Sequence, residues 1–442
     1  LDFVPVANFN GQPGALTVQA IDSSNNDTGA APVYTDDSGT PVYGADLAGT
    51  TTVRAGVDVN NAGGTSSISA TTAPLTIQVA PVNDAPIVVA GKETETLAAG
   101  TEDAAAPPSA TVHDLFNPSF NDAADQQQAA GGPTASTANT LAGVAITGNT
   151  ANATTQGSWQ YSTDGTHWTA IATDLSAGNA LVLSQGVDLR FDPVANFNGQ
   201  PPGLTATLID SSSNSTGAAP LSGSGGSAVY GADLLATPMA LAGVDVTVTG
   251  TTTSLSTASV TLDTSVAQLN DAPIVVAGKE TETLAAGIED AAAPPSATVH
   301  DLFNPSFSDA ADQQQAAGGP TASTANTLAG VAITGNTANA TTQGSWQYST
   351  DGIHWTAIAT DLSAGNALVL SQGVDLRFDP VANFNGQPPG LTATLIDSSS
   401  NSTGAAPLSG SGGSAVYGAD LLATPMALAG VNATVTGTTT SL

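Results

Sequence analysis

The sequence predicts an all-β chain built from repeated β-sandwich units, and three observations favour this class. Thr, Val, Ser, Ala and Gly dominate the 442 residues. Turn-forming residues recur every ~8–12 positions, a spacing typical of short sandwich strands. Long segments of the chain recur almost unchanged, whereas helical periodicity is weak throughout.

The repeat is visible by direct self-comparison. The motif Asn83-Asp84-Ala85-Pro86 returns 187 positions later, and residues 83–255 align with 270–442 without a gap, 168 of 173 positions being identical. Residues 1–11 match residues 189–199 closely. We therefore expect residues 1–82 to be the C-terminal part of a preceding repeat, 83–269 a full repeat and 270–442 a second, truncated one.

The length of the repeat indicates how the units are arranged. Units of 20–50 residues cannot bury a core alone, but a 187-residue unit can. The sequence therefore predicts tandem sandwich domains arranged as beads on a string. An enzyme needs one set of catalytic groups and gains nothing from near-identical tandem copies. Such copies instead indicate a protein that gains length or multiplies a weak binding site.

Strands within the full repeat are predicted from β-branched and apolar runs bounded by turn residues. The predicted strands are 87–90, 141–147, 158–162, 168–172, 180–183, 189–191, 204–209, 244–249 and 259–262. Ser158–Ser162 alternates polar and aromatic residues, and Asp164-Gly165 has the chemistry of a hairpin turn. We expect Trp159 and Trp168, on either side of that turn, to anchor the core.

The charge balance excludes several classes of function. The chain carries 37 acidic and 5 basic residues, a net charge of −32, and has no Cys. Such a chain is repelled by nucleic acid and by anionic lipid. It forms no disulfide and offers no thiolate ligand or Cys nucleophile. No apolar run approaches the roughly 18–20 residues that span a bilayer, and the sequence has no P-loop, nucleophile elbow or His-Glu-x-x-His motif.

Acidic and Asn residues gather at specific points of each repeat. Asn83-Asp84 stands at the boundary between units, and Glu102-Asp103 follows about twenty residues later. Asp122 and Asp125 lie three positions apart, and Asp210 ends the strong predicted strand 204–209. Together with the Pro-x-x-x-Phe-x-Gly turn at Pro193, these motifs resemble the cadherin-like, immunoglobulin-like tandem repeats of giant bacterial RTX adhesins secreted by type I systems.

The resemblance covers the whole chain, and the Val-Asn-Asp-Ala-Pro junction is its most specific part. It implies calcium ions bound by acidic and Asn oxygens at each junction, a chemistry that needs neither Cys nor His. The implied ligands are Asn83, Asp84, Glu102, Asp103, Asp122, Asp125 and Asp210, and their counterparts Asn270, Asp271, Glu289, Asp290, Asp309, Asp312 and Asp397. Asp22 matches Asp210, and we expect it to face Asn83 across the first junction.

The resemblance also implies a function without catalysis. We expect an extracellular, cell-surface region of a large adhesin from a Gram-negative bacterium. It would act as a calcium-stiffened spacer in cell adhesion or biofilm, and its partners would be calcium and its own neighbouring repeats. One alternative is a self-assembling filament or matrix protein joined by homotypic contacts between edge strands. Another is a carbohydrate-binding module that uses calcium together with Trp159 and Trp168, both exposed on one face.

Overall fold

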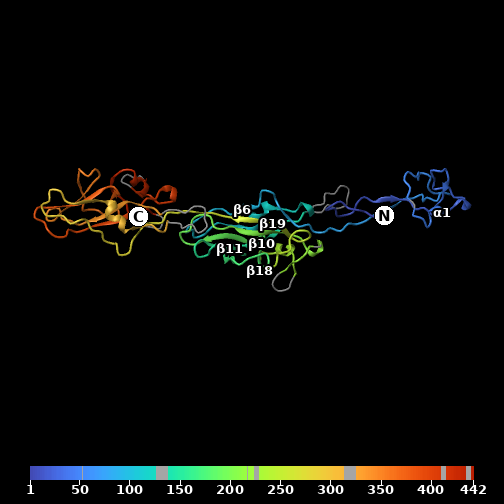
Figure 1. Ribbon diagram of the computed structural model, residues 1–442, viewed down its shortest axis with the longest axis horizontal. Coiled ribbons are helices and arrows are strands. Elements are labelled where there is room, and N and C mark those ends of the chain that lie inside the picture. Colours follow the sequence, from blue (N-terminus) through green and yellow to red (C-terminus); the bar gives the residue numbers. More distant parts are fainter. Residues whose placement is uncertain are drawn as a thin grey trace.

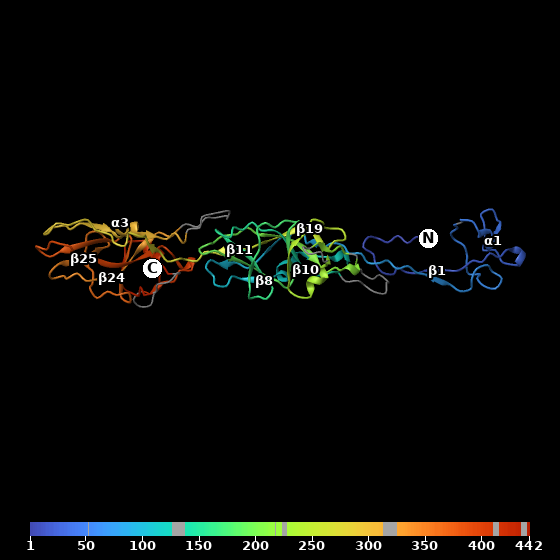
Figure 2. The ribbon, with the colours of Figure 1, turned by 90° about the horizontal axis from the view of Figure 1, so that it is seen from below.

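The structure is a computed structural model that describes residues 1–51, 53–125, 138–216, 218–222, 228–312, 325–409, 415–434 and 440–442. Its regular structure is dominated by strands, so the all-β expectation is confirmed. Figures 1 and 2 show the chain drawn out along one axis, with residues 1–82 at one end, 83–269 between and 270–442 at the other. The boundaries of the units and their independence as beads stay predictions.

Two sheets make up residues 83–269. The larger sheet has the order β18 (Ala240–Val244), β13 (Ala180–Ser184), β10 (Leu141–Gly148), β15 (Leu204–Asp210), β19 (Leu255–Asp263) and β6 (Thr94–Thr96). The smaller sheet has the order β12 (Thr169–Ala170), β11 (Gly157–Ser162), β14 (Asp188–Pro193) and β8 (Ser109–Thr111). All the pairings are antiparallel except that of β19 with β6.

Short elements close the two ends of this unit. Three two-stranded pairs are β5 (Ile87–Val88) with β9 (Phe120–Asn121), β7 (Gly100–Thr101) with β20 (Val266–Ala267), and β16 (Leu221–Ser222) with β17 (Ala228–Val229). The helical turns are α2 (Val112–Phe116), η2 (Asn117–Ser119), η3 (Ala123–Asp125), η4 (Asn214–Thr216) and η5 (Gly231–Leu235).

Two buried clusters form the core: one lies between the two sheets and contains Trp159, and the other, which includes Ala145, Val182 and Leu234, covers the other face of the larger sheet. Trp159 is fully buried and meets Phe191 edge-on, with ring centroids 5.4 Å apart. Its indole N–H donates to the carbonyl of Pro202 at 2.9 Å, which satisfies the polar end of the ring. Trp168 is only half-buried, and the Arg190 guanidinium lies 4.1 Å from its ring centre. The core assignment is therefore confirmed for Trp159 and wrong for Trp168.

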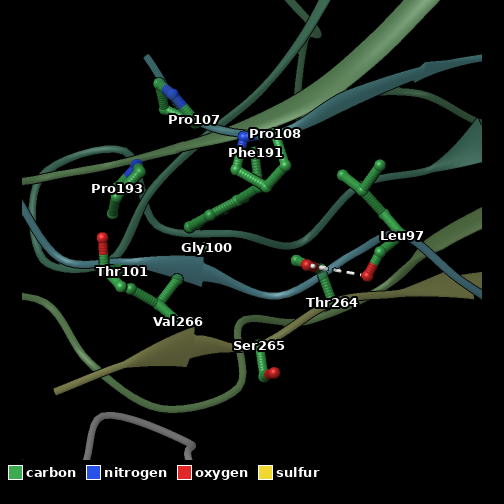
Figure 3. A pocket seen from close by; sticks show the side chains of 10 residues that line it. All are labelled: Leu97, Gly100, Thr101, Pro107, Pro108, Phe191, Pro193, Thr264, Ser265 and Val266. Atoms are coloured by element: carbon green, nitrogen blue, oxygen red, sulfur yellow. Dashed lines mark hydrogen bonds between the residues drawn. The ribbon is translucent and has the colours of Figure 1, made fainter. Parts of the chain in front are cut away.

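The Ala- and Pro-rich segment that follows Glu102 crosses from one sheet to the other. Figure 3 shows Pro107 and Pro108 beside Phe191, with Leu97 and Val266 lining the same gap. The cavity between them is about 10 Å³, room for one water molecule and no larger ligand. This gap is a small packing defect rather than a binding site.

Residues 270–442 repeat most of this arrangement. The first sheet has the order β29 (Leu391–Asp397), β24 (Leu328–Asn336), β27 (Ala367–Ser371) and β32 (Ala427–Val431). The second sheet has the order β22 (Ser296–Thr298), β28 (Asp375–Pro380), β25 (Gly344–Ser349) and β26 (Thr356–Ala357). The pairs are β21 (Ile274–Val275) with β23 (Phe307–Ser308), and β30 (Leu408–Ser409) with β31 (Ala415–Val416). The helical turns are α3 (Val299–Phe303), η6 (Asn304–Ser306), η7 (Asn401–Thr403) and η8 (Gly418–Leu422).

Residues 1–82 form a thinner body. It contains β1 (Leu16–Val18) paired with β4 (Ala73–Leu75), β2 (Tyr34–Thr35) paired with β3 (Pro41–Val42), and the turns η1 (Asn26–Thr28) and α1 (Gly44–Leu47). Leu16 is 56% exposed and Leu75 is 48% exposed, although their counterparts Leu204 and Leu262 are fully buried. The β1–β4 pair therefore leaves its apolar side chains open to solvent.

One predicted strand is displaced. The sequence predicts a strand at 244–249, but β18 ends at Val244. The Asp245 carboxylate accepts hydrogen bonds from the backbone N–H of Thr247 at 2.9 Å and from its hydroxyl at 2.6 Å. This Asx turn bends the chain away from the sheet, so local side-chain hydrogen bonding overrides the β propensity of the segment.

Candidate functional site: acidic clusters at the ends of the units

An acidic cluster rich in side-chain amides lies at the start of residues 83–269. The Asn83 side chain donates to Asp210 at 3.3 Å and accepts from Asn139 at 3.0 Å. Asn139 also donates to Asp125 at 2.5 Å, and Asp125 accepts from the backbone N–H of Asp84 at 2.9 Å. The structure therefore brings together four of the predicted ligand positions of the first junction, Asn83, Asp84, Asp125 and Asp210.

The strand pairings explain why these residues meet. β5 pairs with β9, which places Asn83-Asp84, just before β5, beside the turn η3 that contains Asp125. β10 pairs with β15 so that Leu141 lies opposite Asp210. Asn139, two residues before Leu141, is thereby held at the same end of the sheet. Antiparallel pairing thus gathers polar residues from four separate segments at one edge of the sandwich.

Asp122 is the least compensated member of the cluster. It is only 4% exposed, and neither of its carboxylate oxygens has a hydrogen-bond partner among the described residues. Burial raises the pKa of Asp122 to about 7, with smaller contributions from the negative charges of Asp125 and Asp210. A buried carboxylate without a hydrogen-bond partner is costly, because the ion has lost its hydration.

The neighbouring carboxylates share this environment. Burial is also the largest cause of the raised pKa of Asp125 and of the raised pKa of Asp210. For each of them, hydrogen bonds from neighbouring groups offset part of the penalty. Three carboxylates that all resist ionisation together describe a pocket that favours a compensating positive charge.

The same cluster is built again at the start of residues 270–442. Asn270 donates to Asp397 at 3.3 Å, Asp271 donates through its backbone N–H to Asp312 at 2.8 Å, and Asn326 donates to Asp312. Asp309 is 4% exposed, neither of its oxygens has a partner in the described structure, and burial raises its pKa. The arrangement therefore belongs to the repeat and is not an accident of one copy.

Glu102 and Asp103 do not join the cluster of Asn83, which corrects the grouping predicted from the sequence. Glu102 is fully buried at the opposite end of the unit, where its carboxylate accepts from Asn198 at 2.9 Å and from the backbone N–H of Leu269. Asp103 accepts from the backbone N–H of Asn196 at 3.2 Å. Both acids therefore lie where the chain leaves the unit for the next one.

Strand pairing again gives the reason. β7 immediately precedes Glu102 and runs parallel to β20, which ends two residues before Leu269. The segment from β5 to β7 therefore runs the length of the sandwich, so residues close in sequence lie at its opposite ends. A parallel pairing between residues 166 positions apart leaves no local signal in the sequence.

The acids at the end of one unit, Glu102 and Asp103, face the acidic cluster at the start of the next unit. Burial raises the pKa of Asp271 to about 6, and the charges of Asp103 and Asp312 add to the effect. One oxygen of Asp271 is buried and has no partner among the described residues. The junction between 83–269 and 270–442 therefore combines Glu102 and Asp103 from one side with Asp271, Asp309, Asp312 and Asp397 from the other.

Glu289 and Asp290 are the counterparts of Glu102 and Asp103 in residues 270–442. Asn385 donates to Glu289 at 3.1 Å, and the backbone N–H of Asn383 donates to Asp290 at 3.0 Å, so the local contacts are preserved. Glu289 is nevertheless exposed, whereas Glu102 is fully buried. The backbone N–H of Leu269 is a donor that Glu102 has in addition to Asn198.

Asp22 does not face Asn83, and that expectation is wrong. Asp22 is exposed and accepts from the backbone N–H of Ser24 at 2.9 Å, just as Asp210 accepts from Ser212 at 2.9 Å. The Asn83 amide is satisfied by Asp210, Thr253 and Asp84. Asp22 lies near α1, which Figure 2 places at the far end of residues 1–82.

Amide residues are the part of the site that the sequence analysis missed. The side-chain amides of Asn139, Asn326 and Asn198 donate to the predicted acids, and Asn196 donates through its backbone N–H. Asn is common in this chain, so composition gives no signal. The usable signal is position: Asn139 stands just before the strand that pairs with Asp210, and Asn198 lies in the turn that follows β14.

The chemistry of the donors fits a hard divalent cation. Calcium takes six to eight oxygen ligands from carboxylates, amide carbonyls and backbone carbonyls, which are the groups gathered here. Within the described residues, no group of three or more His, Cys, Asp or Glu side chains is already arranged to hold a metal ion. The buried, unpartnered oxygens of Asp122, Asp309 and Asp271 are nevertheless what a cation would satisfy.

In the part of the chain that the structure describes, no helix is long and apolar enough to cross a membrane. Comparison with protein-family models, with curated proteins and with solved structures found no match to this chain.

Proposed function

We propose that this chain is an extracellular structural repeat region of a large bacterial surface adhesin, in which calcium at the junctions stiffens a spacer for cell adhesion or biofilm. The observation that carries the proposal is the pair of unpartnered carboxylates, Asp122 and Asp309, each buried at the entry end of a unit. The repeat organisation and the resemblance to cadherin-like adhesin repeats support the extracellular setting.

The mechanism follows from where the oxygens come from. Asp309, Asp312 and Asp397 belong to the entry end of one unit, and Glu102 and Asp103 belong to the exit end of the previous one. Calcium, when bound, supplies the positive charge that this junction lacks. Without it, the facing carboxylates repel one another and favour an open, mobile linker. With it, the same acids hold the two ends together.

Apolar contact adds to this linkage. The Leu269 side chain, in the linker, lies against Gly404 of the following unit so closely that a β-carbon on Gly404 would meet its Cδ1 at 2.7 Å. The backbone N–H of Leu269 donates to Glu102. Leu269 thus contacts both Glu102 and the following unit. Neutralising the junction acids would therefore also hold the contact between Leu269 and Gly404 in place.

Titration calorimetry with calcium tests the proposal. We expect saturable binding that is lost in a chain carrying both Asp122→Asn and Asp309→Asn. The matched control is Asp174→Asn with Asp361→Asn, which removes two exposed acids of the same repeat and leaves binding unchanged. Equal binding by the two variants would show only diffuse attraction to an acidic surface and would contradict the proposal.

A further inference from the structure

The outer face of the smaller sheet carries an aromatic ring that the core does not use. Trp159 and Phe191 are paired across β11 and β14 and are buried in the core. The next pair, Gln160 and Arg190, therefore lies on the opposite, outer face. Trp168 stands two residues before the partner of Gln160 in β12 and shares that face. It is half-buried and, among the described residues, belongs to neither core cluster of its unit.

Arg190 is held over Trp168 although two acids flank it. Asp188 and Asp192 lie two positions away on either side in β14 and so occupy the same face. Within the described part of the chain, Arg190 nevertheless forms no ion pair. Its guanidinium lies 4.1 Å from the ring centre of Trp168, and its Nε donates to Gln160 at 2.8 Å. The contacts thus orient the arginine on the indole instead of neutralising it.

This network is fixed on one side and free on the other. Gln160 donates to one carboxylate oxygen of Asp192 at 2.9 Å. As far as the described residues extend, the second oxygen of Asp192 and the terminal nitrogens of Arg190 make no hydrogen bond. Ser158, opposite Asp192 in the sheet, adds a hydroxyl. An oriented donor fork and a carboxylate beside an indole suit a sugar, whose hydroxyls take both polar partners while its C–H face packs on the ring.

The same network is built in residues 270–442. Arg377 lies 3.9 Å from the ring centre of Trp355 and donates through Nε to Gln347 at 2.8 Å. In residues 1–82 the counterpart of Arg190 is Asp2, so the arginine is not a fixed part of every repeat. One chain therefore presents two copies of this surface, which a role in the core does not explain.

The charge of the surface narrows the class of ligand. The chain carries a net charge of −32 and repels anionic polymers, and the arginine at the centre of the surface disfavours a cationic one. We propose that the outer face formed by Trp168, Arg190, Gln160 and Asp192 binds a neutral pyranose polysaccharide, as does its counterpart in residues 270–442. Two weak sites on one chain bind a polymer by avidity. The repeats then contact a glycan directly, a role beyond that of a spacer and independent of calcium.

Affinity electrophoresis of the full chain tests the proposal. The probes are three neutral polysaccharides, hydroxyethylcellulose, galactomannan and xyloglucan, with polygalacturonate as the anionic comparison and chelator in every gel. Relative to a gel without polysaccharide, we expect retardation by at least one neutral polymer and none by polygalacturonate. Unchanged mobility with all three neutral polymers would overturn the proposal. Because chelator removes calcium throughout, that failure would leave the proposed function untouched.

Tryptophan variants show whether this face is the site. Trp168→Ala with Trp355→Ala should raise the apparent dissociation constant at least about tenfold, because the stacking surface is lost. Trp168→Ala alone leaves one site and should give an intermediate loss, because avidity disappears. The matched control is Tyr230→Ala with Tyr417→Ala, which removes another half-buried aromatic ring from each unit and should bind like the native chain. Retardation that survives the tryptophan pair, or that falls equally in the tyrosine pair, would contradict the proposal.

A second pair of variants keeps both indole rings. Arg190→Asp with Arg377→Asp introduces the residue type found at Asp2 and removes the donor fork. We expect weaker retardation by the neutral polymers with a melting temperature close to that of the native chain. Native binding by this pair would show that the arginine only supports the tryptophan, and the assignment of the network as a sugar site would fail.

Discussion

Replacing the buried orphan carboxylate in both copies, as Asp122→Asn with Asp309→Asn, should have opposite effects on stability with and without calcium. The pKa of Asp122 is raised from 3.8 to about 7. Ionising it in the folded chain therefore costs about 3 pKa units, or roughly 4 kcal/mol at about 1.4 kcal/mol per unit. This figure is an upper bound, because the calcium-free pocket can admit water.

The sign of the pH dependence follows from the direction of the shift. Because the folded state holds the proton more tightly than the unfolded state, the contribution of Asp122 is most favourable below its unfolded pKa. That stability is lost as pH rises from about 4 to about 7. In chelator at pH 8 we therefore expect the Asn variant to melt at a higher temperature than the native chain. In excess calcium the order should reverse, because the native chain alone gains the ion.

Differential scanning calorimetry gives the melting temperature under four conditions: pH 5 and pH 8, each with chelator and with calcium. The control is Asp174→Asn with Asp361→Asn, which should follow the native chain in each. A variant that melts at a lower temperature than the native chain in chelator at pH 8 would show that Asp122 is stabilised by a partner. The view of Asp122 as an uncompensated charge would then be refuted.

Three further predictions concern other parts of the chain. Glu102→Gln should abolish the calcium-dependent lengthening of the particle in small-angle scattering. Calcium should still raise the melting temperature of this variant, because the acidic clusters at the start of each unit remain. Loss of both effects would contradict the view that Glu102 and these clusters act at opposite ends of the unit. Trp159→Ala should cost about 3–5 kcal/mol, the usual range for a large core truncation, whereas Trp168→Ala should cost far less in the same denaturation assay. Gly231→Ala should destabilise its unit, because a β-carbon there overlaps the carbonyl oxygen of Asp210; an unchanged hydrogen-exchange pattern around β15 would argue against a rigid contact.

Features set by local pattern were predictable from the sequence. The strand at Leu204–Asp210 is a run of alternating β-branched and apolar residues, and β11 shows the period of two that places Trp159 in the core. Asp122, Asp125 and Asp210, which were among the expected ligands, lie near one another: Asp122 follows β9, Asp125 ends η3 and Asp210 ends β15. The self-comparison indicated that any site would appear more than once.

Features set by distant pairing were not predictable. Glu102 is carried to the exit end by the parallel pairing of β7 with β20. Asn139 joins the cluster only through the register of β10 on β15. Asp22 was placed by homology to Asp210, but a counterpart of Asp210 belongs to the entry end of its own unit. In each case the long-range pairing of strands decided the position, and one sequence read alone does not contain it.

The most direct measurement is a crystal structure of the chain grown with calcium in excess, with an anomalous difference map at the junction between residues 83–269 and 270–442. We expect a peak within about 2.3–2.6 Å of the Asp309 carboxylate, the distance at which calcium binds oxygen, with Asp312 and Asp397 oxygens around it. A well-ordered junction that holds only water at this position would contradict the account.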